Sequence, residues 1–205
     1  MKRLLVLVFM CLPALAKADM LPALFDVTGV AANDTLNIRS APDANAQRIG
    51  ELGPDAKNVE VVGLGPNGKW AMIGLPEATG WVSLRFLERV SETNWIQDEI
   101  PLACFGTEPF WSVGVDGDRQ VLTHRHFDAE EEAFDITWVA APDAGMSGTM
   151  GLYATGYGSD VFTNISSAQC SDGMSDRTFG LSIALYIMTN EQTVGYKGCC
   201  ALVAR

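Results

Sequence analysis

Basic residues and histidines are scarce in this sequence, and both shortages narrow its function. The chain of 205 residues has 14 Lys and Arg against 25 Asp and Glu, and its formal net charge is −11. Because binding to phosphate draws its energy from Lys and Arg, this balance excludes nucleic acid and anionic lipid as expected partners. The two histidines, His124 and His126, leave few candidates for the base that a Ser or Cys nucleophile requires.

Familiar catalytic motifs are missing too. No HExxH sequence is present, and "GMSGTMG" at residues 145–151 lacks the spacing of a GxSxG nucleophile elbow. The acidic residues are scattered and form no recognisable glycosidase pair. We therefore expect a protein without enzymatic activity, without a cofactor and without a metal.

Long apolar runs are absent beyond the first residues. The run at residues 4–15 follows a Lys-Arg pair, precedes "AKA" at residues 16–18, and is shorter than the roughly 20 residues of a membrane-spanning helix. This is the pattern of a secretory signal peptide, residues 1–18, cleaved after Ala18. Its removal takes three basic residues and no acids, so the net charge falls from −11 to −14. We expect a periplasmic or secreted protein with no membrane span.

Cysteine is absent between Cys11, inside the signal segment, and Cys104. The other cysteines are Cys170, Cys199 and Cys200. In an oxidising compartment an even number predicts disulfides, with three possible pairings if all four are bridged. Neighbouring strand residues point to opposite faces, so Cys199 and Cys200 either pair separately with Cys104 and Cys170, or one stays free. Their restriction to the second half indicates two domains.

Short apolar runs separated by turn residues are plentiful. Before residue 91 they occupy residues 25–32, 35–39, 48–52, 59–64, 69–75 and 80–88, with an Asn-Gly hairpin turn at residues 65–69. After a polar stretch ending in Pro, residues 91–101, which we interpret as a linker, they recur at residues 110–125, 134–141, 150–156, 178–188 and 193–205. The one candidate helix or acidic loop is "DAEEEAFD", residues 128–135. The sequence predicts an all-β protein: a small β-barrel at residues 23–90 and a second, disulfide-linked antiparallel β domain at residues 102–205.

Three motifs in the first domain resemble the bacterial SH3-like domain. They are "LNIRSAP" at residues 36–42, "NGKW" at residues 67–70 and "GWVSLRFL" at residues 80–87. The resemblance implies a small β-barrel that acts as a non-enzymatic binding module, with peptidoglycan peptides as the usual ligand. The second half, with "CFGTEPFWSV", "CSDGMSD" and "GCC", resembles a β domain of uncharacterised bacterial exported proteins, which implies a compartment and a fold but no activity.

Aromatic and acidic residues supply the candidate binding groups. In "GTEPFW", Pro109 sets a turn, and Phe110 and Trp111 point to opposite sides of an extended chain, one into the core and one toward solvent. In "CSDGMSD", Asp172-Gly173 suits a turn, which favours an internally hydrogen-bonded, disulfide-held loop over a catalytic one. The candidate ligand-binding residues are Trp70, Trp81, Glu108, Trp111, Asp172 and Asp176.

His124 and His126 stand two residues apart on one strand face, as a metal pair would, with Asp128 or one of Glu130 to Glu132 as a third ligand. The alternative, which we favour, is two exposed histidines beside a charged loop. The expected function is that of an exported, non-enzymatic protein of the cell envelope that recognises peptidoglycan or an envelope protein. The alternative is a cell-wall hydrolase using the histidine cluster, or an inhibitor of a wall-acting enzyme that presents residues 170–176.

Overall fold

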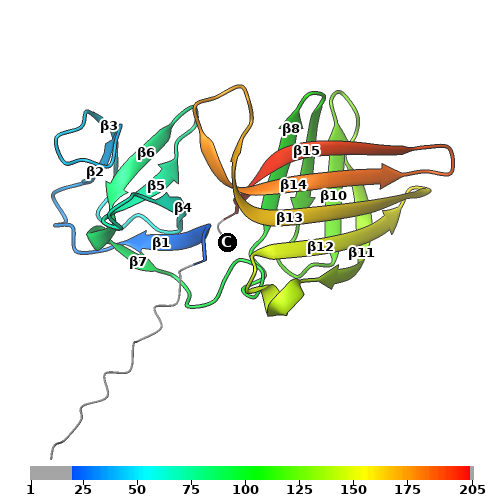
Figure 1. The fold of residues 1–205 in the computed structure, drawn as a ribbon, viewed down its shortest axis with the longest axis horizontal. Helices are drawn as coiled ribbons and strands as arrows, with labels where there is room; N and C mark the ends of the chain where they lie inside the picture. Colours follow the sequence, from blue (N-terminus) through cyan, green and yellow to red (C-terminus); the bar gives the residue numbers. More distant parts are fainter. Residues whose placement is uncertain (1–19, 204–205) are drawn as a thin grey trace, which may run out of the picture.

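The computed structural model describes residues 20–203, and nearly all of its regular structure is β-sheet (Figure 1). This confirms the all-β prediction. The helical segments in this range are two short 3₁₀ turns, η1 (Leu84–Phe86) and η2 (Pro142–Gly145), and neither has the length or apolarity to cross a membrane. The predicted signal peptide and Cys11 lie outside the described residues.

The first module is a seven-stranded antiparallel sheet with the strand order β3-β2-β6-β5-β4-β1-β7. Its strands are β1 (Ala23–Val27), β2 (Leu36–Arg39), β3 (Arg48–Leu52), β4 (Val59–Leu64), β5 (Trp70–Gly74), β6 (Thr79–Ser83) and β7 (Leu87–Arg89). The apolar stretch at residues 80–88 is therefore divided between β6, η1 and β7. At the predicted Asn-Gly turn, Gly68 has φ 65°, and its N–H donates to the Gly65 carbonyl at 2.9 Å.

The second module is a closed barrel with the strand order β10-β11-β12-β13-β14-β15-β8-β9. Its strands are β8 (Leu102–Thr107), β9 (Phe110–Val115), β10 (Val121–His126), β11 (Glu132–Ala140), β12 (Thr149–Gly156), β13 (Ser159–Ser171), β14 (Thr178–Met188) and β15 (Thr193–Leu202). Pairing of β15 with β8 closes the barrel.

Two disulfides hold the last strand in place. Cys104 of β8 bonds to Cys200, and Cys170 of β13 bonds to Cys199. The two neighbouring cysteines of β15 thus pair separately, which was one of the two arrangements expected from their opposite faces. The barrel is fastened covalently at its closing seam and at a second strand.

Packed side chains fill the inside of the barrel. Alternate residues of β14 point into it, since Leu181, Ile183 and Leu185 are buried in this core. Trp95 is 1 % exposed and belongs to the same core, although it comes from the segment that we interpreted as a linker. Its Nε1 donates to Ser167 Oγ at 3.1 Å, and its carbonyl accepts from Arg119 at 3.3 Å. The segment at residues 91–101 is therefore anchored to the barrel.

One local prediction holds in one of its two alternatives, and another is wrong. Residues 128–131 form an acidic loop rather than a helix, and β11 starts at Glu132, so that Phe134 lies in the barrel core at 1 % exposure. His124 is not an exposed strand residue, since it points inward from β10 and is buried. In both cases alternate residues of the strand point into the barrel. Because charged residues surround Phe134 and His124 in the sequence, this alternation is not recognisable there.

The loop between β13 and β14 reaches the first module (orange in Figure 1). Thr79 Oγ1 donates to the Asp176 carbonyl at 3.0 Å and accepts the Thr178 N–H at 2.7 Å, and the Asp176 N–H donates to the Glu77 carbonyl at 3.2 Å. Elsewhere, the Leu202 N–H donates to Glu60 Oε1 at 2.9 Å. Direct polar contacts thus join the two modules.

Candidate functional site

The "CSDGMSD" loop is organised around a single carboxylate. Asp172 Oδ1 accepts the N–H groups of Met174 at 3.0 Å and Ser175 at 2.9 Å, and the Ser175 hydroxyl also bonds to this carboxylate. The hydrogen bond from the Ser175 backbone is the main reason why the pKa of Asp172 is lowered. With Cys170 in a disulfide, the loop is internally hydrogen-bonded, as expected, and its carboxylate is already engaged.

A groove of about 950 Å³ lies on the outer face of the barrel beside this loop. Glu108 and Asp172 both line it, so these two candidate residues do lie at one site. The other two candidates of this module lie elsewhere. Trp111 is buried in the barrel core at 4 % exposure, and Asp176 is engaged through its backbone at the contact with the first module. Phe110, the neighbour of Trp111, is 46 % exposed, so the two rings point to opposite sides as predicted.

The histidine pair faces the barrel interior. Burial, with a smaller contribution from His126, holds the pKa of His124 below its usual range. His126 lies at the end of the strand, 6.4 Å from Tyr196 between ring centroids. Among the described residues there is no group of three His, Cys, Asp or Glu placed to hold a metal ion. A buried His124 also cannot reach a substrate in solution.

A larger groove, about 1110 Å³, crosses the first module. Trp70 lines it at the start of β5, directly after the hairpin turn, and Phe86 of η1 lies on its edge. Trp81 does not line this groove; its ring packs toward Gly65, where an added Cβ would lie 3.5 Å from it. The groove therefore has one of the two predicted tryptophans.

The charge of this groove is opposite to that of the molecule. Its lining includes Arg39, Lys69 and Arg85 but a single acid, Asp34, whereas the whole chain carries −11. The Arg85 guanidinium lies 4.4 Å from the centroid of the Phe86 ring, and Arg39 donates to the Ala46 carbonyl at 2.9 Å. These basic residues come from separate strands and turns, so no local pattern in the sequence distinguishes them.

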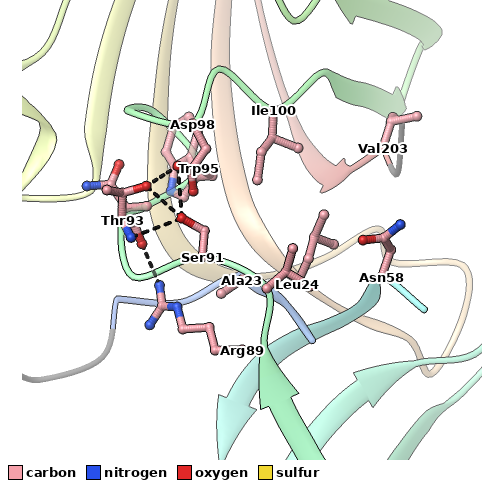
Figure 2. Close-up of a pocket in the computed structure, with 12 residues that line it drawn as sticks. Ala23, Leu24, Asn58, Arg89, Ser91, Thr93, Trp95, Asp98, Ile100 and Val203 are labelled. Atoms are coloured by element: carbon pink, nitrogen blue, oxygen red, sulfur yellow. Dashed lines mark hydrogen bonds between the residues drawn. The ribbon is translucent and has the colours of Figure 1, made fainter. Parts of the chain in front are cut away.

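A third hollow, about 330 Å³, lies where residues 89–100 pass between the modules (Figure 2). Its polar side is a closed cluster: Asp98 accepts from the hydroxyls of Ser91 at 3.0 Å and of Thr93, and Arg89 donates to the Thr93 carbonyl at 2.9 Å. Leu24 forms part of its apolar side (Figure 2). Because these polar groups bond to one another, the hollow offers a ligand mainly apolar wall.

Comparison with protein-family models, with curated proteins and with solved structures gives no match to this chain. What the groove can do therefore rests on its own chemistry. Guanidinium and ammonium groups beside an indole suit a small ligand that combines carboxylates with apolar parts.

Proposed function

We propose that this is an exported, non-enzymatic protein of the cell envelope whose first module, residues 23–90, acts as a bacterial SH3-like domain that binds the peptide part of peptidoglycan. The observation that carries the proposal is the basic groove beside Trp70 in a protein of charge −11. Peptidoglycan peptides bear free carboxylates on short apolar side chains, and Arg39, Lys69 and Arg85 supply the matching donors.

The disulfides and the first residues of the sequence support a location of the protein outside the cytoplasm. Two disulfides persist in oxidising compartments, and residues 1–18 have the composition of a signal peptide. Hydrolysis by the second module is disfavoured because His124 is buried. An inhibitory role for residues 170–176 is disfavoured because the Asp172 carboxylate is engaged within the loop and Asp176 contacts the first module.

Co-sedimentation with purified, insoluble peptidoglycan at low salt tests the proposal. We expect the double variant Lys69→Glu/Arg85→Glu to lose roughly tenfold or more in retention, because each reversal replaces an attraction of about 0.5–1 kcal/mol by repulsion. Trp70→Ala should weaken retention without changing its salt dependence. Arg125→Glu, an exposed charge reversal on the barrel, is the matched control and should bind like the natural protein.

Two results would overturn the proposal. One is equal retention of the natural protein and the Lys69/Arg85 double variant. The other is clearing of peptidoglycan in a zymogram by the purified natural protein, which would establish a hydrolase.

A further inference from the structure

Four aromatic side chains form a row across the outside of the barrel. Trp138 of β11 lies directly opposite Tyr153 of β12, Tyr153 opposite Phe162 of β13, and Phe162 opposite Tyr186 of β14. Ring centroids are 6.0 Å apart for Trp138 and Tyr153, 6.0 Å for Trp138 and Phe162, and 6.1 Å for Phe162 and Tyr186. The four rings are one contiguous surface.

This surface faces solvent. The residues on either side of Tyr153, Phe162 and Tyr186 along each strand point into the barrel core, so the rings themselves point outward. Trp138 is 44 % and Tyr186 43 % exposed. The outer face of an antiparallel sheet packed on one side is ordinarily polar, so a row of large aromatics there is unusual.

The row ends on a glycine that Tyr186 covers. Gly195 of β15 pairs with Tyr186, and a Cβ built there would lie 3.2 Å from the Tyr186 ring. The ring thus lies flat along the sheet rather than standing away from it. At the other end, a Cβ on Gly151 would lie 3.5 Å from the Trp138 ring. Small neighbours let both terminal rings lie close to the backbone.

A second line of residues runs along one side of the row. The next register position on each strand is occupied by Ala140, Gly151, Asn164, Ala184 and Lys197, which pair with one another in that order. Asn164, Ala184 and Lys197 also line the groove of about 950 Å³ that contains Glu108 and Asp172. The aromatic row therefore lies directly beside this groove, although none of its four rings lines it.

Hydrogen-bonding groups border the other side. There Asp135 pairs with Thr155 and Thr155 with Asp160, and Asp160 is hydrogen-bonded to the Tyr153 hydroxyl. The row of rings is consequently one residue wide, with Asp135, Thr155 and Asp160 on one side and Asn164 and Lys197 among the residues on the other. A protein partner would need a broader apolar patch at the centre of its interface. A narrow, elongated ligand with apolar faces and polar edges fits this arrangement better.

We propose that the aromatic row and its adjoining groove bind an uncharged glycan chain. A sugar ring presents C–H groups on its faces, which the electron-rich faces of aromatic rings attract, and hydroxyl or amide groups along its edges for Asn164, Thr155 and Asp160. Strands lie about 4.8 Å apart, so four rings span about 14 Å, the length of roughly three sugar units. Asp135 and Asp160, together with the net charge of −11, repel acidic polysaccharides.

This inference does not depend on the peptide site proposed for the first module. Soluble oligomers of N-acetylglucosamine and of β-1,4-glucose, six units long and free of peptide, probe the row alone. Titration of the whole protein with each, followed by calorimetry, should show binding to at least one. The Lys69→Glu/Arg85→Glu variant should bind these oligomers like the natural protein, so the two proposals fail separately.

Single variants identify the surface. Trp138→Ala and Tyr186→Ala should each weaken binding roughly tenfold, from the loss of one stacking contact. Tyr186→Phe keeps the ring and should stay within about threefold. Ala184→Gln narrows the groove beside the row without removing a ring and should also weaken binding. Phe127→Ala removes a ring that is 62 % exposed and outside the row, and serves as the control.

A purely structural role for the row predicts a different outcome. Cross-strand aromatic pairs stabilise sheets, so Trp138→Ala could lower the melting temperature in either case. Unchanged glycan affinity in folded Trp138→Ala and Tyr186→Ala variants would overturn the proposal. So would binding restricted to an acidic polysaccharide such as polygalacturonate, or no binding of either neutral oligomer at millimolar concentration.

Discussion

At the residue scale, the fold makes His124 difficult to protonate. It lies inside the barrel at 7 % exposure, its Nε2 has no hydrogen-bond partner among the described residues, and burial lowers its pKa. A charged imidazolium there would lose its hydration without gaining a partner. Protonation of His124 should therefore destabilise the folded barrel.

Acid should destabilise the protein through His124. Because the folded state holds this group neutral, the unfolded state binds more protons below pH 6.5, and stability falls as pH decreases from there through the folded pKa. The loss is at most about 1.4 kcal/mol per pH unit for one proton. In urea unfolding between pH 4.5 and 7.5, the stability of His124→Leu relative to the natural protein should increase as pH falls. Identical slopes would contradict the assignment.

At the scale of elements, the loop between β13 and β14 contains both a hydrogen-bonded turn and the residues that contact the first module. Asp172 fixes the turn, and Asp176 and Thr178, a few residues later, bond to Glu77 and Thr79 of the first module. The geometry of the turn therefore sets where the contact falls.

Asp172→Ala should destabilise both the turn and the contact between the modules. Removing the acceptor of the Met174 and Ser175 N–H groups should lower the free energy of unfolding by about 1–2 kcal/mol. The amide protons of Asp176 and Thr178 should then exchange faster with solvent, as measured by NMR hydrogen exchange. Asp172→Asn keeps one acceptor oxygen and is the matched control. Faster exchange in neither variant would show that the turn does not position the contact.

Much of the element structure follows from the sequence, and the exceptions have physical causes. Residues 48–52 and 59–64 are strands with the expected bounds, and the turn that follows Asp116 is held by the N–H groups of Gln120 and Val121, which donate to the Asp116 carboxylate. Trp138 is a residue whose direction the alternation of the sequence does not predict. Alternation from Phe134 and Ile136 places it in the core, but a bulge between Ile136 and Trp138 turns it outward. Because a bulge depends on the partner strand, alternation within one strand does not predict it.

The basic groove and the aromatic row escape sequence reasoning for a related reason. Arg39 and Arg85 are far apart in the chain, and Tyr153 and Tyr186 belong to strands whose register is fixed by pairing through β13. Trp70 is found because its position after a hairpin turn is a local signal. Residues that converge through long-range pairing leave no such signal.

At the scale of the whole molecule, Glu60 joins the modules through a carboxylate that is buried where they meet. It accepts the Leu202 N–H at 2.9 Å, and burial raises its pKa to about 7, against the opposing effects of that hydrogen bond and of Arg177. Arg177 itself packs against the first module at Gly74, where an added Cβ would lie 2.6 Å from its Nε. The contact is thus sensitive to proton uptake.

Stability should fall as pH rises through the range in which Glu60 ionises. A folded pKa of about 7 against an ordinary value of 4.5 means that the folded state binds more protons between these values. The decline should reach up to about 3 kcal/mol by neutral pH. Glu60→Gln keeps an acceptor for Leu202 and should flatten this part of the urea-unfolding profile. Because His124 acts in the opposite direction, each variant is compared with the natural protein at every pH. A Glu60→Gln profile that keeps the full decline would contradict the role of this carboxyl.

The Cys104–Cys200 bond has a mechanical consequence. It joins residues separated by 96 positions, at the first and last strands of the barrel. A pulling force applied at Met20 and Val203 would pass from Cys104 directly to Cys200, so the chain between them would carry no tension. The first module would extend while the barrel kept its length. Under load the protein would behave as an extensible segment in series with a fixed one, until a reductant released the bond.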